Sequence, residues 1–202
     1  MRRSFIALII VFAALLASCG KAGGAADALT PEFQRFLEIR RSRPQATCTE
    51  ELGGCTYSLE AGVLRVSDAA GEVLWQSKGS WYVEGFRLGD VDGDGSPDLL
   101  FTLWKSYSFG PTHPERMEND VTAVRCHLFL YTLRGGHMKS LWGSSNLPRP
   151  IYAFELSFDG EKTPVASGAV LRTQEGQYTD DFTRTDALEH VYVWRGWGFV
   201  EE

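Results

Sequence analysis

The sequence lacks the short motifs on which many enzymes depend. It contains no G-x-S-x-G, no H-E-x-x-H and no phosphate-binding loop. Its four histidines are scattered, and none has the spacing that a metal site requires. An active site need not be local in sequence, so the missing motifs argue against an enzyme only in part. We therefore expect a non-enzymatic protein.

Basic residues are also few. The chain has 20 lysines and arginines against 26 aspartates and glutamates, for a net charge of −6. No basic stripe with interleaved aromatic residues is present, and such a stripe is the usual footprint of nucleic-acid binding. We therefore expect no nucleic-acid partner.

Long apolar runs are limited to one, from Phe5 to Ala17, which is shorter than the roughly twenty residues of a membrane span. It follows Arg2 and Arg3 and leads into Leu-Ala-Ser-Cys19, so residues 1–18 form a secretory signal that resembles a bacterial lipoprotein signal. The alternatives, an ordinary cleaved signal or a short anchor, also imply export. Removal of the signal leaves 18 basic against 26 acidic residues, a net charge of −8.

The lipoprotein resemblance implies cleavage before Cys19 and attachment of lipid to its thiol and new amino group. The protein would then be held at the membrane by that lipid, without a basic surface. Gly20 in place of aspartate favours the outer membrane of a typical Gram-negative cell. The expected location is the cell envelope, on the periplasmic or the surface face.

After the signal, residues 19–29 are small and polar and suit a flexible tether. Thr30 and Pro31 then favour a helix start. Phe33, Phe36, Leu37 and Arg40 share one face of that helix, which we expect to cover a sheet edge or the first sheet. The remainder, residues 30–202, is long enough for one domain with one good core.

Three cysteines remain in the mature domain, and export permits disulfides. Cys48 and Cys55 enclose a turn-rich segment and are the expected pair, adding about 2–3 kcal/mol of stability. Cys126 is expected to be an unpaired thiol inside a strand. A catalytic pair with His127 is disfavoured because neighbours on a strand point to opposite faces.

The domain is rich in strand patterns. Three hairpins are predicted, over residues 63–75, 128–142 and 191–199. A repeat at 67 positions relates Trp75 to Trp142 and Ser77 to Ser144. These features predict an all-β, antiparallel fold of roughly ten strands, with four-stranded units near 81–142 and 151–200 after a hairpin near 56–76.

One stretch carries the clearest chemistry, the D-x-D-x-D-G-x-x-D loop of residues 90–98. Its carboxylates repel one another unless a cation lies among them, and glycine at the sixth position allows the sharp turn. Calcium is the expected ion, because it accepts six to eight oxygens with loose geometry. An EF-hand loop would place glutamate where Phe101 stands. The predicted ligands are Asp90, Asp92, Asp94, the backbone carbonyl of Ser96, and Asp98.

Residues 85–100 as a whole resemble an FG-GAP or VCBS-type repeat, the family that includes the calcium-bearing blades of integrin-like β-propellers. The resemblance implies a strand, a calcium loop held by the residues just named, and a second strand. The second copy of the repeat carries Lys162 and lacks the acids, so only one loop is expected to bind. The chain supplies about two and a half blades, fewer than the usual four to eight. An open fragment capped by the helix, a distorted sandwich and a ring completed by another subunit all remain possible architectures.

The leading hypothesis is therefore a calcium-stabilised envelope lipoprotein that acts as a binding or scaffold module for a protein or glycan. One alternative is an envelope hydrolase that uses the acidic loop or the polar insertion at residues 105–120, because long loops are often functional. Another is an accessory subunit of a surface assembly.

Overall fold

The computed structural model describes residues 29–43, 47–106, 123–158 and 168–202. Within these ranges the chain forms one helix and twelve strands, which confirms the all-β prediction. No helix in the described ranges is both long and apolar enough to cross a membrane. The predicted lipidation site Cys19 and most of the polar insertion lie outside the described residues.

The strands form three antiparallel sheets, each a simple meander in chain order. The first sheet consists of β1 (Cys48–Leu52), β2 (Cys55–Glu60), β3 (Val63–Ser67) and β4 (Val73–Gln76). The second consists of β5 (Tyr82–Gly89), β6 (Asp98–Lys105), β7 (Arg125–Arg134) and β8 (His137–Gly143). The third consists of β9 (Ile151–Phe158), β10 (Ala169–Glu175), β11 (Leu188–Trp194) and β12 (Phe199–Glu201).

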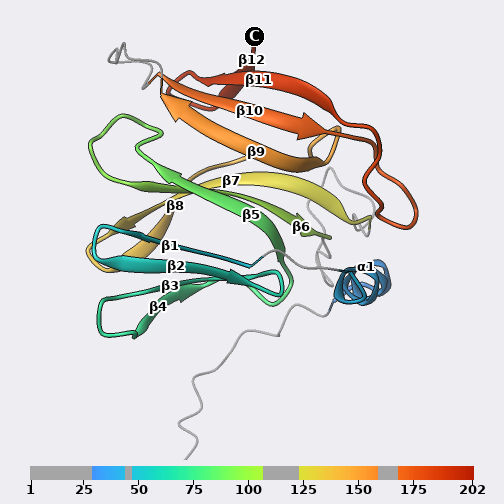
Figure 1. Ribbon diagram of the computed structural model, residues 1–202, viewed down its shortest axis with the longest axis horizontal. Coiled ribbons are helices and arrows are strands. Elements are labelled where there is room, and N and C mark those ends of the chain that lie inside the picture. The colour runs from blue at the N-terminus through green and yellow to red at the C-terminus, as the bar shows by residue number, and fades with distance from the viewer. Residues whose placement is uncertain (1–28, 44–46, 107–122, 159–167) are drawn as a thin grey trace, which may run out of the picture.

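The three sheets are stacked face to face, with the second sheet between the other two (Figure 1). Every residue of its strand β6 is buried. Leu99, Phe101 and Leu103 pack against the first sheet, whereas Leu100 and Trp104 pack in the core shared with the third sheet. A run of apolar residues without alternation is the pattern expected of a strand that is covered on both faces.

The outer face of the first sheet is polar, whereas that of the third sheet mixes polar side chains with a row of valines, Val170, Val193 and Val200. On the first sheet, Thr49, Ser58, Arg65 and Gln76 lie in one row across the strands, and on the third sheet Arg172 stands between Glu155 and Val191. Within the described residues the sheets do not close into a ring. The described part of the chain is thus an open stack of three sheets with the helix at one end, and a ring completed by another subunit stays a prediction.

The expected two and a half blades and ten strands need correction. The predicted hairpin near 56–76 belongs to a complete four-stranded sheet over residues 48–76, because β1 pairs along β2 from Cys48 opposite Leu59 to Leu52 opposite Cys55. Strand β1 was missed because its sequence, Cys-Thr-Glu-Glu-Leu, is polar and does not alternate. It lies at the edge of the sheet, where a strand needs little apolar burial.

The predicted repeat is visible in the hydrogen bonds of the first two sheets. Ser77 donates its backbone N–H to the carbonyl of Leu64 (2.8 Å) and accepts the N–H of Leu64 on its hydroxyl (3.1 Å). Ser144 makes the same pair of bonds with Leu128, at 2.9 Å each. Trp75 and Trp142 likewise lie on the last strand of their sheets. The repeat therefore reflects equivalent structural positions.

Helix α1 (Pro31–Arg41) begins at the predicted cap, where Thr30 Oγ1 accepts the N–H of Phe33 at 3.2 Å. Phe36 is fully buried, and its ring contacts the rings of Tyr82, Trp104 and Phe182. The helix thus covers the ends of β5 and β6 and the connection between β10 and β11 (Figure 1). It therefore lies over strand ends of the second sheet, which is neither of the two expected positions, a sheet edge or the first sheet.

The predicted Cys48–Cys55 disulfide is not formed, and the pairing is corrected by the register of the first sheet. Both cysteines are free thiols, as is the buried Cys126. Cys48 lies opposite Leu59, four residues along β2 from Cys55. At about 3.3 Å per residue, the two cysteines are roughly 13 Å apart along the strand. A disulfide needs Cα atoms within about 7 Å, so the hairpin keeps these thiols apart.

This correction predicts the thiol content of the mature chain. A soluble form that lacks residues 1–19 keeps every described residue and should titrate three thiols per chain in denaturant without reductant. The parent protein should have the same melting temperature with and without reductant, as should the Cys48→Ser/Cys55→Ser control variant, which cannot form this disulfide. If only one thiol of the parent protein can be titrated, the Cys48–Cys55 disulfide is formed and this correction is wrong.

Candidate metal centre

The acidic loop connects β5 to β6 and is held at both ends by the second sheet. Gly89, the last residue of β5, pairs with Asp98, the first residue of β6. Between them, Val91 of the loop is fully buried. Gly93 and Gly95 have φ values of +79° and +89°, a region that strongly favours glycine. The loop therefore turns at its glycines, as the sequence predicts.

Three of the predicted ligands converge. One carboxylate oxygen from each of Asp90, Asp92 and Asp98 lies within 4.8 Å of the others. Asp98 is only 1% exposed, whereas Asp90 and Asp92 are partly buried. Hard oxygen ligands from several carboxylates are the donors that calcium prefers. This group is the candidate metal centre.

Asp98 gives the clearest sign that the centre suits a cation. Its Oδ2 accepts the backbone N–H groups of Val91 (3.0 Å) and Asp92 (3.2 Å). Its Oδ1 is buried and has no partner at hydrogen-bond geometry among the described residues, although the hydroxyl of Thr132, opposite Asp98 on β7, is close enough to lower the Asp98 pKa. Burial raises the pKa of Asp98 to about 6, and the nearby negative charge of Asp92 contributes to the rise. A cation beside Oδ1 would compensate this buried charge.

Asp94 has a different environment. Its Oδ1 accepts the N–H of Ser96 at 2.8 Å, and its Oδ2 forms an ion pair with Arg134. The Ser96 hydrogen bond, followed by the Arg134 charge, holds the pKa of Asp94 below its usual range. Arg134 Nη2 also lies 4.0 Å from Oδ2 of Asp92. Asp94 therefore lies next to the aspartate group without being part of it.

Arg134 was not predicted from the sequence. It is the last residue of β7, and β7 pairs with β6 so that Thr132 lies opposite Asp98. Two residues further along the same face, Arg134 reaches the acidic loop. Only the strand pairing brings it there, because it is 36 residues from Asp98 in the chain. Its guanidinium supplies positive charge where the sequence predicts a cation.

The chemistry of this group suits coordination better than catalysis. The group consists of three aspartates, and no histidine belongs to it among the described residues. His127 lies elsewhere in the second sheet, opposite Leu103, and burial lowers its pKa to about 4. Cys126, its neighbour, is in the core shared with the third sheet. Most of the insertion at 105–120 lies outside the described residues, as does the second loop of the repeat near Asp159.

Comparison with known proteins gives no match: no protein-family model, no curated protein and no solved structure is similar to the chain. The FG-GAP or VCBS-type resemblance of residues 85–100 therefore stays a prediction from sequence. So does the lipoprotein resemblance of the first residues. The functional argument depends on the geometry of the described residues.

The raised pKa of Asp98 predicts a pH effect in the calcium-free protein. Its folded-state pKa of about 6 lies above the unfolded value of 3.8, so the folded chain binds the extra proton between these pH values. Stability from this group should be fully present below about pH 4 and lost as the pH rises through 6. Asp98→Asn should remove this effect, which amounts to roughly 3 kcal/mol because each pKa unit corresponds to about 1.4 kcal/mol.

The measurement is urea unfolding of metal-free parent and variant between pH 4 and pH 7.5. Asp186→Asn removes an exposed aspartate of the connection between β10 and β11 and is the matched control. A parent and Asp98→Asn variant with parallel pH profiles would show that Asp98 is ordinarily solvated.

Proposed function

We propose that this protein is a non-enzymatic lipoprotein of the bacterial cell envelope, a binding or scaffold module stabilised by one calcium ion. The observation that carries the calcium proposal is the convergence of Asp90, Asp92 and the buried Asp98. The export and lipid anchor rest on the sequence around Cys19. The module would hold a protein or glycan partner near the membrane, most simply at the outer membrane.

The calcium ion would have a structural role. Asp90, Asp92 and Asp98 would provide side-chain oxygens, with Asp94 and the carbonyl of Ser96 completing the set as the resemblance implies. Asp94 would have to exchange its ion pair with Arg134 for the metal. Because the loop joins β5 to β6, the ion would link the central strands of the stack and neutralise acids that otherwise repel one another.

Calcium should raise the melting temperature of the soluble form relative to chelator. With a dissociation constant of roughly 10⁻⁴ to 10⁻³ M, as in extracellular modules, 10 mM calcium would add about 1.5–2.5 kcal/mol. That corresponds to roughly 3–8 °C for a domain of this size. Asp92→Ala should lose the response, and Asp186→Asn should retain it. Equal melting temperatures with calcium and chelator would refute the proposal.

Arg134 should compete with calcium. Replacement by glutamine removes a positive charge beside Asp92 and Asp94, so we expect calcium affinity to increase about two- to fivefold. Titration calorimetry with calcium measures the change, and Arg172→Gln on the outer face of the third sheet is the control. Weaker calcium binding by Arg134→Gln would instead assign Arg134 a supporting role.

A further inference from the structure

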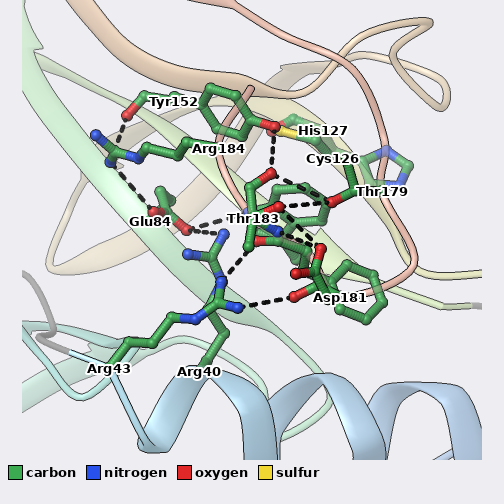
Figure 2. Close-up of polar contacts among 12 residues, drawn as sticks. Arg40, Arg43, Glu84, Cys126, His127, Tyr152, Thr179, Asp181, Thr183 and Arg184 are labelled. Atoms are coloured by element: carbon green, nitrogen blue, oxygen red, sulfur yellow. Dashed lines mark hydrogen bonds and ion pairs between the residues drawn. The ribbon is translucent and has the colours of Figure 1, made fainter. Parts of the chain in front are cut away.

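A second feature of the molecule is a polar cavity of about 570 Å³, at the end of the stack covered by helix α1. Its walls come from three separate parts of the chain: the end of α1, the start of β5 and the connection between β10 and β11. They include three arginines, Arg40, Arg43 and Arg184, and a single carboxylate, Glu84. Figure 2 shows these four side chains pointing toward one another.

Arg40 is the most informative of the three arginines. It is 8% exposed, and its guanidinium lies over the rings of Phe36, Tyr82 and Trp104 at 5.4–5.8 Å. Its Nη2 forms an ion pair with Glu84 at 3.1 Å. Its Nε is buried and makes no hydrogen bond within the described ranges. Glu84 and the surrounding ring faces therefore hold the positive charge of Arg40 in a fixed position in the cavity wall.

The other two arginines are held by backbone carbonyls. Arg43 donates to the carbonyls of Phe182 (2.9 Å) and Asp181 (3.0 Å), and Arg184 donates to the carbonyl of Tyr152 (3.0 Å) (Figure 2). A guanidinium has five N–H donors, so each retains donors after these bonds. The carbonyl contacts orient the two groups without neutralising their charge.

Among the described residues that line the cavity, Glu84 alone has a carboxylate, and it is already engaged. It accepts the indole N–H of Trp104 at 3.1 Å and pairs with Arg40 at 3.1 Å and Arg184 at 3.6 Å. The carboxylate of Asp181 lies beside the lining, where it accepts the N–H (3.2 Å) and the hydroxyl (2.8 Å) of Thr183. Three guanidinium groups therefore face two carboxylates, an excess of one positive charge in a protein that is acidic overall. Positive charge gathered in a cavity attracts anions and raises their local concentration.

We infer that this cavity binds a small ligand through an oxyanion, a carboxylate or a phosphate group. Planar guanidinium groups match both anions with paired, charge-assisted hydrogen bonds. The remaining donors of Arg43 and Arg184 provide these bonds, and the buried guanidinium of Arg40 adds its positive charge to the cavity wall. The volume is within the range of small-molecule sites, and Thr183 and Tyr82 add further wall contacts.

This assignment deepens the binding role proposed above and rests on it. It does not depend on calcium, because the cavity and the acidic loop involve different residues. The acidic loop precedes β6, whereas Trp104, which supports Glu84, lies near the other end of the same strand.

The test is titration calorimetry of the soluble form with inorganic phosphate, with D-glucuronate and with neutral D-glucose, at constant ionic strength. Phosphate or glucuronate should bind, and glucose should not. Whichever anion binds more tightly identifies the oxyanion source. Arg43→Gln and Arg184→Gln should each weaken that binding about three- to tenfold, and the double variant should abolish it.

Arg41→Gln is the matched control, because Arg41 is an exposed arginine next to Arg40 on the same helix. It should bind as the parent does, and far-UV circular dichroism checks the fold of each variant. Absence of binding by both anions, or equal weakening by Arg41→Gln, would overturn the assignment. A normal calcium melting response in that case would leave the calcium proposal intact. Anion binding without a calcium response would reject only the calcium site.

Discussion

The structure depends on the burial of strand β6 on both of its faces. Its apolar residues alternate between two cores, and this burial holds the three sheets together. The same burial encloses two charged residues, Asp98 at the first position and Lys105 at the last. Burial shifts their pKa values in opposite directions, to about 6 for Asp98 and about 8 for Lys105. A charge enclosed in this way needs compensation, and at Asp98 the surrounding loop is built to supply it.

Both candidate sites are therefore connected to one strand. Asp98 begins β6 and contributes a buried oxygen to the acidic loop, whereas Trp104 near its end donates to Glu84 in the arginine-lined cavity. These two residues are six positions apart, which corresponds to roughly 20 Å of extended chain. Since the sites lie at opposite ends of a rigid strand, each has its own charge balance. An acidic loop on one side and a basic cavity on the other give this acidic protein two distinct electrostatic surfaces.

Local patterns predicted the local structure well. The three hairpins, the Thr30 cap and the glycine turns of the acidic loop all depend on residues that are close in sequence. The errors involve pairings at a distance. Strand β1 is polar because it lies at a sheet edge, and the register of its hairpin separates Cys48 from Cys55. A disulfide was predicted because Cys48 and Cys55 are close in sequence. The antiparallel pairing of β1 with β2 instead places the two cysteines at opposite ends of the hairpin.

The sequence by itself determined the strand-rich class, the repeat and the crowding of carboxylates in one loop, because alternation, turn residues and charge spacing act over a few residues. Tertiary structure alone decided which aspartates converge, because Asp98 becomes buried only when β6 is covered on both faces. It also decided that Arg134 faces Asp94 and that Arg40, Arg43 and Arg184 share a cavity with Glu84. Those groups come from separate parts of the chain, and only packing of the sheets and helix brings their charges together.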